Sequence, residues 1–138
     1  MSPLGRVLII AGSDSGGGAG VQADLKTVTA LGGYAATAIT AVTVQNTLGV
    51  TGVHPIPLDV IAAQARAVLS DIGADAIKTG MLGSAAVVER VAAILDSSDA
   101  PAVVDPVMIA KGGAALLADD AVAAVRSLMI PRAALLTP

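Results

Sequence analysis

Apolar residues in this chain fall into two kinds of segment that alternate along the sequence. The first kind is a short run in which almost every position is apolar. Such a run is typical of a strand that is covered on both faces of a parallel sheet. These runs predict strands at residues 7–11, 34–42, 76–78, 102–105 and 133–136.

The second kind of segment repeats its apolar residues every three or four positions, as one face of a helix does. It predicts helices at residues 21–31, 58–72, 84–95 and 119–128. The glycine pair that follows residue 31 is a favourable end for the first helix. Strands that alternate with helices predict an α/β sandwich with a parallel sheet.

Composition and length are consistent with one domain over residues 1–138. Hydrophobic residues make up 54% of the chain and aromatic residues only 1%, so the core is expected to consist of Ala, Val, Leu and Ile. No internal repeat, low-complexity segment or linker divides the sequence.

Charge and residue usage exclude several classes of function. The net charge is −3 and the eight Lys and Arg residues are scattered, which argues against nucleic-acid binding. The absence of cysteine excludes disulfides, thiolate metal sites and a cysteine nucleophile. No apolar stretch approaches the length of a membrane span, and the first residues lack the pattern of a secretory leader. We therefore expect a cytoplasmic protein that binds a small molecule, with no membrane partner.

A glycine-rich loop is the most informative feature of the sequence. Residues 12–20, GSDSGGGAG, contain five glycines and lie between a predicted strand and a predicted helix. Glycines allow the backbone to approach a ligand closely, and the free N–H groups at the start of a helix can face a polar ligand. The loop therefore predicts a small-molecule site near residue 12.

Two known glycine motifs fit this loop poorly. A P-loop requires Gly-Lys followed by Ser or Thr, but Gly20 is followed by Val21 and Gln22. Residues 18–23 match G-x-G-x-x-A formally, yet they begin well after the strand end, and no acid follows the second predicted strand. A dinucleotide-binding oxidoreductase is therefore a distant alternative.

Three further segments follow predicted strands: residues 43–47, residues 79–81, and residues 105–108 with 111–113. Parallel strands place their carboxyl ends at one edge of the sheet, so these segments are expected beside the glycine loop.

Each candidate side chain in these segments also has a plainer interpretation. Gln45 can read an amide-like heteroaromatic edge, or it can satisfy loop backbone groups. Asp24 in the first helical turn can contact a ligand or compensate the helix dipole, and Met81 can belong to the hydrophobic core.

Asp105 ends an apolar strand, so it needs a partner such as a metal-bound phosphate or a cation. Lys111 can neutralise phosphate or remain solvated. Lys78 has the same two interpretations, and His54 has no neighbour that indicates a role.

The motifs of this chain resemble those of the hydroxymethylpyrimidine/phosphomethylpyrimidine kinases, a branch of the ribokinase-like superfamily. Residues 11–27, AGSDSGGGAGVQADLKT, are similar to the N-terminal signature of that family. Its later motifs are matched in order by QNT at 45–47, KTGML at 78–82 and DPVM at 105–108. The resemblance covers essentially the whole chain and implies a ribokinase-like three-layer α/β/α sandwich with a mostly parallel sheet.

The resemblance also implies an activity and a set of roles. The expected reaction is transfer of phosphate from ATP, with Mg²⁺, to 4-amino-5-hydroxymethyl-2-methylpyrimidine and then to its monophosphate, in thiamine biosynthesis. The implied substrate-binding residues are Gln45, Gly12, Asp24, Met81 and Val107. Asp105 and Lys111 would lie toward the phosphate and metal region, without assignment of a metal ligand. A homodimer is also implied.

One departure from the family pattern limits this expectation. The last predicted strand ends two residues before Pro138, whereas the family carries its ATP site, anion hole and catalytic cysteine in a C-terminal part. We therefore expect the chain to be the N-terminal, substrate-binding part of a kinase domain, truncated, with no catalytic residue of its own and no kinase activity alone. The alternatives are a pyridoxal-type vitamin kinase and a non-catalytic pyrimidine-binding protein.

Overall fold

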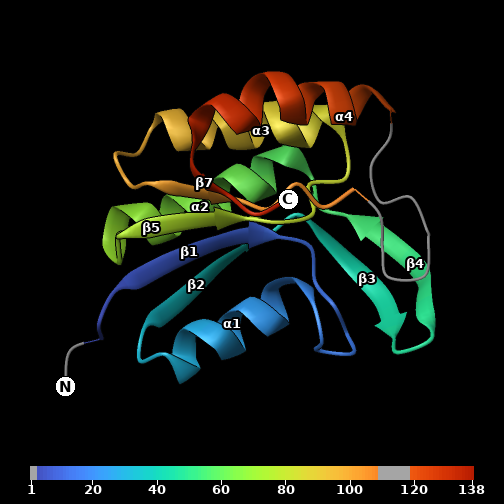
Figure 1. The fold of residues 1–138 in the computed structure, drawn as a ribbon, viewed down its shortest axis with the longest axis horizontal. Helices are drawn as coiled ribbons and strands as arrows, with labels where there is room; N and C mark the ends of the chain where they lie inside the picture. Colours follow the sequence, from blue (N-terminus) through green and yellow to red (C-terminus); the bar gives the residue numbers. More distant parts are fainter. Residues whose placement is uncertain (1–2, 109–118) are drawn as a thin grey trace.

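A sheet of parallel strands forms the centre of the molecule, as the computed structural model in Figure 1 shows for residues 3–108 and 119–138. The strand order is β2-β1-β5-β6-β7, and each neighbouring pair is parallel. The strands are β1 (Arg6–Ala11), β2 (Tyr34–Ile39), β5 (Ala76–Thr79), β6 (Ala102–Val104) and β7 (Ala133–Leu136). The predicted parallel sheet is confirmed.

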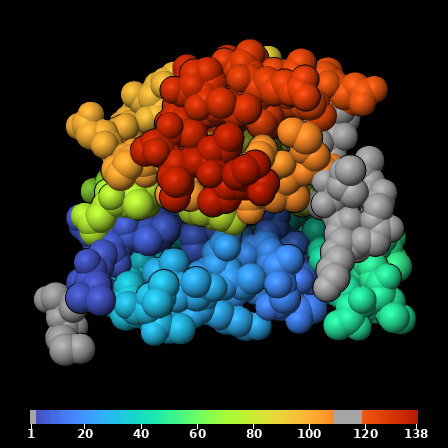
Figure 2. All heavy atoms as spheres, in the orientation of Figure 1, coloured from blue at the N-terminus to red at the C-terminus, as the bar shows by residue number. Residues whose placement is uncertain are grey.

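Helices cover both faces of this sheet and complete the three predicted layers (Figure 1). One face packs against α1 (Gly20–Ala30), and the other lies under α2 (Leu58–Asp71), α3 (Ala85–Asp96) and α4 (Asp119–Ala124). Figure 2 shows the segment that follows residue 118, in red, and α1, in light blue, on opposite sides of the molecule. The last predicted helix continues beyond α4 as a π-helical turn, η1 (Val125–Met129), and a 3₁₀ turn, η2 (Ile130–Arg132). No helix in the described part is long and apolar enough to cross a membrane.

Strand β1 shows why the apolar runs lack alternation. From Leu8 to Ala11 its side chains point in turn to two separate cores, and these four residues are buried. Leu8 and Ile10 belong to the large core beneath α2, α3 and α4, whereas Ile9 and Ala11 pack with Val21 of α1. Because neither face of this part of the strand meets solvent, each of these four positions favours an apolar residue.

One predicted strand is wrong in extent. The run at 34–42 breaks at Thr40, where β2 ends and an antiparallel hairpin begins, formed by β3 (Ala41–Asn46) and β4 (Gly49–Pro55). The buried Thr40 hydroxyl donates a hydrogen bond of 2.7 Å to the carbonyl oxygen of Met81, which fixes the chain at the break. Residues 43–46, predicted as a loop, therefore lie on a strand.

The carboxyl ends of the central strands meet at one edge of the sheet. Backbone hydrogen bonds continue just past the strand ends, from Thr40 N–H to Ala11, from Gly80 N–H to Ile10 and from Asp105 N–H to Thr79. These bonds align the segments that leave β1, β2, β5 and β6, which is the arrangement that places a ligand site in an open α/β sheet.

Candidate functional site

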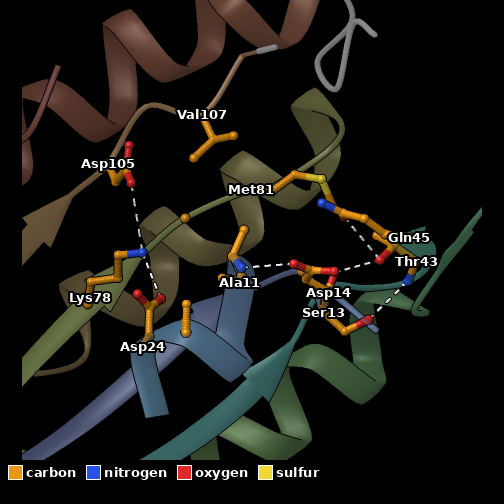
Figure 3. Close-up of a pocket in the computed structure, with 15 residues that line it drawn as sticks. Ala11, Ser13, Asp14, Asp24, Thr43, Gln45, Lys78, Met81, Asp105 and Val107 are labelled. Carbon is orange, nitrogen blue, oxygen red and sulfur yellow. Dashed lines mark hydrogen bonds and ion pairs between the residues drawn. The ribbon is translucent and has the colours of Figure 1, made fainter. Parts of the chain in front are cut away.

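A cavity of about 280 Å³ opens at this edge of the sheet, between the glycine-rich loop, the hairpin and the ends of β5 and β6 (Figure 3). Its volume lies near the lower end of the range for small-molecule pockets, which suits a single-ring ligand. All the predicted site residues that the structure describes line it: Gly12, Asp24, Gln45, Met81, Asp105 and Val107. Lys111 lies outside the described residues.

The glycine-rich loop is organised by Asp14, a residue to which the sequence assigned no role. The Asp14 side chain is buried, and its carboxylate accepts hydrogen bonds from the backbone N–H groups of Gly16 (2.8 Å), Gly18 (3.0 Å) and Ala19 (2.8 Å). Its own N–H donates to Oε1 of Gln22 at 2.7 Å. The loop is therefore folded around an internal anion.

This arrangement changes the expected use of the loop. The N–H groups of Gly18 and Ala19 bind Asp14, and the N–H of Val21 donates to the carbonyl oxygen of Gly12 at 3.0 Å. We expected the N–H groups at the start of the helix to face a polar ligand, and for these three amides that expectation is wrong. The loop shapes the wall of the cavity and brings its backbone close to the ligand space.

Gly20 shows why this loop requires glycine. Its φ is +57°, a conformation that residues with a side chain rarely adopt. A β-carbon at this position would lie 2.5 Å from the carbonyl oxygen of Gly12, which is backbone and cannot turn aside. The loop and the first turn of α1 can approach this closely only because the side chain is absent.

Two serines attach the loop to the hairpin. The Ser13 hydroxyl accepts from the N–H of Thr43 at 2.9 Å, and the Thr43 hydroxyl donates back to the Ser13 carbonyl at 2.7 Å. The Ser15 hydroxyl accepts from the N–H of Gln45 at 2.8 Å and donates to the carbonyl oxygen of Gln45. Loop and strand therefore hold the backbone of Gln45 in a fixed place at the cavity.

The Gln45 side chain is left available for a ligand. Its Oε1 accepts only a long contact of 3.4 Å from the Thr43 hydroxyl, and its Nε2 has no hydrogen-bond partner in the part of the chain that the structure describes. Asn46, the next residue, has the plainer role, because its Oδ1 accepts from the N–H groups of Leu48 and Gly49 in the hairpin turn.

Gly12, Met81 and Val107 form the less polar walls. Met81 is 8% exposed and lines the cavity, so the interpretation of this residue as plain core is only half right. A β-carbon at Gly12 would collide with the Met81 methyl group, so the absent side chain leaves room for Met81. In Figure 3, Met81 and Val107 both reach toward the space between Lys78 and Gln45.

A charged cluster occupies the other end of the cavity. Lys78 Nζ lies 2.7 Å from Oδ2 of Asp24 and 3.9 Å from Oδ2 of Asp105. Asp24 therefore lines the cavity as the ion-pair partner of Lys78. Its expected place in the first helical turn is wrong, since α1 begins at Gly20 and has no acid in that turn. Asp105 was expected to need a partner as a buried acid, but its side chain is 39% exposed and its contact to Lys78 is long, at 3.9 Å.

Sequence reasoning missed part of this site. The roles of Asp14, Ser13 and Ser15 depend on contacts between the loop and the hairpin, and no spacing along the chain encodes them. The pairing of Lys78 with Asp24 joins residues that are 54 positions apart. The hairpin had no clear signal in the sequence either. Buried and exposed residues alternate from Ala41 to Val44, but the exposed ones are the two valines, so polarity does not follow burial along this strand.

The side chains at the charged end of the cavity provide only some of the ligands that a bound metal ion needs. Among the described residues, no group of three or more His, Cys, Asp or Glu side chains converges as a metal site. Two carboxylates, Asp24 and Asp105, do converge there, with an ammonium between them. Mg²⁺ is commonly held by one or two carboxylates together with substrate phosphates, so this set fits an ion that arrives with a nucleotide.

Comparison with known proteins agrees with the geometry. Residues 14–138 match the family model described as phosphomethylpyrimidine kinase. A hydroxymethylpyrimidine/phosphomethylpyrimidine kinase of Streptomyces coelicolor is 55% identical over 132 residues, which cover 96% of this chain and 49% of that protein. The chain thus spans about half the length of the curated relatives it matches.

Solved structures show the same likeness. The phosphomethylpyrimidine kinase of Clostridium difficile 630 superimposes with a TM-score of 0.90 at 44% identity, over 96% of this chain and 58% of that one. The pyridoxal kinase of Staphylococcus aureus, solved with pyridoxal and also with AMP-PCP, has 41% identity and a TM-score of 0.86 for the pyridoxal complex, which covers 96% of this chain and 48% of that one. The family resemblance and the ribokinase-like fold class are confirmed. This chain belongs to the phosphomethylpyrimidine kinase family.

Proposed function

We propose that this chain forms the substrate-binding part of a hydroxymethylpyrimidine/phosphomethylpyrimidine kinase of thiamine biosynthesis. The whole enzyme would phosphorylate hydroxymethylpyrimidine and then phosphomethylpyrimidine, with ATP as donor. The observation that carries the proposal is the convergence of Gly12, Asp24, Gln45, Met81 and Val107 on one cavity of about 280 Å³. These residues come from the glycine loop, α1, β3 and the segments after β5 and β6, and only the fold unites them.

The polar and apolar walls suit an aminopyrimidine ring. In this proposal the Gln45 amide pairs with the ring edge, since its Nε2 donor is unused in the described structure and its Oε1 is only weakly engaged. Met81 and Val107 pack against the ring faces, and the missing side chain at Gly12 admits the ring close to the backbone. The hydroxymethyl group then points toward Asp24 and Lys78.

The charged end is the place for phosphate chemistry. Phosphoryl transfer is catalysed mainly by positioning and by neutralising charge on the transferring group. When Mg²⁺ and ATP are bound, the ion would neutralise the phosphates, and Asp105 would be its protein contact. Asp105 suits that role because its side chain is 39% exposed and holds Lys78 only loosely, at 3.9 Å.

This chain alone is expected to be inactive. Within the described residues, the cavity offers one cation, Lys78, next to two carboxylates, and the loop amides that could bind an anion are held by Asp14. ATP-dependent formation of phosphomethylpyrimidine by the purified 138-residue chain would contradict this expectation.

Calorimetric titration tests the proposal and separates it from a pyridoxal-type kinase. We expect the 138-residue chain to bind hydroxymethylpyrimidine at least tenfold more tightly than pyridoxal, a difference of about 1.4 kcal/mol. The reverse preference would favour a pyridoxal-type vitamin kinase, which the likeness to the Staphylococcus aureus enzyme keeps as second candidate. Binding of neither ring would overturn the proposal.

The proposal includes a homodimer. Apolar side chains on the outer part of the hairpin are open to solvent, with Val44 61% and Leu48 93% exposed. Exposed apolar surface of this kind is a common feature of association surfaces. Sedimentation velocity should give twice the mass of 13.4 kDa, and a monomer at all concentrations would contradict this part.

A further inference from the structure

Lys78 is the one Lys or Arg among the described residues that line the cavity, and the cavity also contains three carboxylates. One of these, Asp14, is engaged by the glycine loop. The other two, Asp24 and Asp105, both face Lys78. Any anion that enters this end of the cavity therefore meets two negative side chains and a single positive one.

The position of Lys78 is set by the sheet. It lies on β5 between Ile77 and Thr79, which are fully buried in the opposite direction, so the alternation of the strand directs Lys78 to the α1 side. Its side chain is 23% exposed, and those of Asp24 and Asp105 are 24% and 39% exposed. The cluster is thus partly shielded from solvent and still open to a ligand.

Lys78 and Gln45 lie at opposite ends of the cavity in Figure 3, with Met81 and Val107 between them. A ring whose edge pairs with Gln45 therefore points its opposite substituent at Lys78. For the two substrates of the proposed reaction that substituent differs in charge. The alcohol carries none, whereas a phosphate monoester carries between one and two negative charges at neutral pH.

We propose that Lys78 determines whether the cavity accepts the phosphate monoester. This inference rests on the proposed function and deepens it. When the neutral alcohol binds, the Lys78 ammonium keeps its hydrogen bond to Asp24. When the monoester binds, the ammonium keeps that bond and also donates a hydrogen bond to the ester phosphate. The loose contact to Asp105, at 3.9 Å, is the one it gives up. The alcohol needs no such contact, so the two substrates depend on Lys78 differently.

The test compares the two ligands in the same protein. Dissociation constants for hydroxymethylpyrimidine and phosphomethylpyrimidine are measured by calorimetry with the 138-residue chain and its variants. Lys78→Gln is expected to weaken the monoester at least about tenfold more than it weakens the alcohol, as loss of a charge-assisted hydrogen bond does. Lys78→Arg, which keeps the charge, should restore most of the affinity for the monoester.

Arg90→Gln is the matched control, because it removes one positive charge from α3 at a residue that does not line the cavity. It should change neither constant. Asp24→Asn supplies a second test, whose expected effect has the opposite sign. It replaces the first test if circular dichroism shows that Lys78→Gln does not fold. Removal of the carboxylate frees the ammonium, so the monoester should bind more tightly relative to the alcohol.

The outcomes separate this inference from the proposed function. If the unmodified chain binds neither ligand, the proposed function falls and this inference falls with it. If the alcohol binds but Lys78→Gln weakens both ligands equally, Lys78 only shapes the cavity and the inference is overturned while the proposed function stands. An unchanged affinity for the monoester in Lys78→Gln overturns it in the same way.

Discussion

The buried carboxylate of Asp14 accepts a hydrogen bond of 2.8 Å from the backbone N–H of Ala19, the residue that immediately precedes α1. Together with the bonds from Gly16 and Gly18, it closes the glycine-rich loop on itself. The side chain that shapes the cavity wall is thus inside the loop and does not need to touch the ligand.

Asp14→Asn is therefore expected to loosen the loop. The amide keeps one acceptor oxygen in place of two and loses the charge, so we expect the free energy of unfolding to fall by about 1–2 kcal/mol. Urea unfolding measures this change, and hydrogen exchange should accelerate at Gly16, Gly18 and Ala19. Glu89→Gln makes the same charge change at an exposed site on α3 and should have little effect. Unchanged exchange at the three loop amides would contradict the assigned role.

Gln45→Glu tests the role of the amide in ring recognition. The exchange keeps the shape of the side chain but replaces its donor group with a carboxylate, so hydroxymethylpyrimidine should bind about tenfold more weakly, as expected for one lost hydrogen bond with its penalty. Gln64→Glu makes the same exchange on α2, outside the cavity, where the amide pairs with the backbone of Ile39. Its affinity for the pyrimidine should be unchanged. Equal losses in both variants would argue against a ligand contact at Gln45.

An ion pair near the N-terminus predicts a dependence of stability on pH. Hydrogen bonds from the Arg6 guanidinium hold the pKa of Asp75 at about 2, below its ordinary value of 3.8. A carboxyl whose pKa is lowered by folding stabilises the native state above its ordinary pKa, and this contribution is lost as the pH falls toward the lowered value. The free energy of unfolding should therefore decrease between about pH 4 and pH 2.

Asp75→Asn removes the titrating group and should flatten that part of the profile fully. Arg6→Gln removes the guanidinium but keeps the backbone N–H of residue 6, which also bonds to Asp75 at 2.7 Å, so it should flatten the profile only in part. Urea unfolding at a series of pH values measures the profiles. If both variants keep the slope of the unmodified chain, the pair does not contribute to its acid sensitivity.

The buried hydroxyl of Thr79 has no hydrogen-bond partner in the described structure. A buried polar group without a partner costs about 1–3 kcal/mol, so Thr79→Val should stabilise the fold by about 1 kcal/mol. Thr40→Val is the matched control of opposite sign, because the buried Thr40 hydroxyl donates to Met81. It should destabilise by a similar amount, and thermal unfolding measures both. A loss of stability in Thr79→Val would mean that its hydroxyl is satisfied after all.

The layers of the fold could be predicted because β1, which lies inside the sheet, is buried on both faces from Leu8 to Ala11, and the other parallel strands are also short, largely apolar runs. The convergence of Gly12, Gln45 and Asp105 followed from the rule that parallel strands end at one edge. The hairpin was missed because the apolar run passes through Thr40 without a glycine or proline, and a tertiary hydrogen bond to Met81 marks the break.

The electrostatics of the site could not be predicted in the same way. Lys78, Asp24 and Asp105 are isolated charges in the sequence, and only the adjacency of α1, β5 and β6 makes them one cluster. Asp14 looked like one polar residue of a flexible loop. Its function depends on the backbone path around it, which spacing and composition do not describe.

The most direct test of the central claim is a titration of the ¹⁵N-labelled chain with hydroxymethylpyrimidine, followed by two-dimensional NMR. The account predicts that chemical shifts change for the backbone amides of Gly12, Gly80 and Val107 and for the side-chain amide of Gln45, the residues around the cavity at the sheet edge. Shifts confined to residues elsewhere, such as those between α2 and α3, or no shifts at saturating ligand, would contradict it.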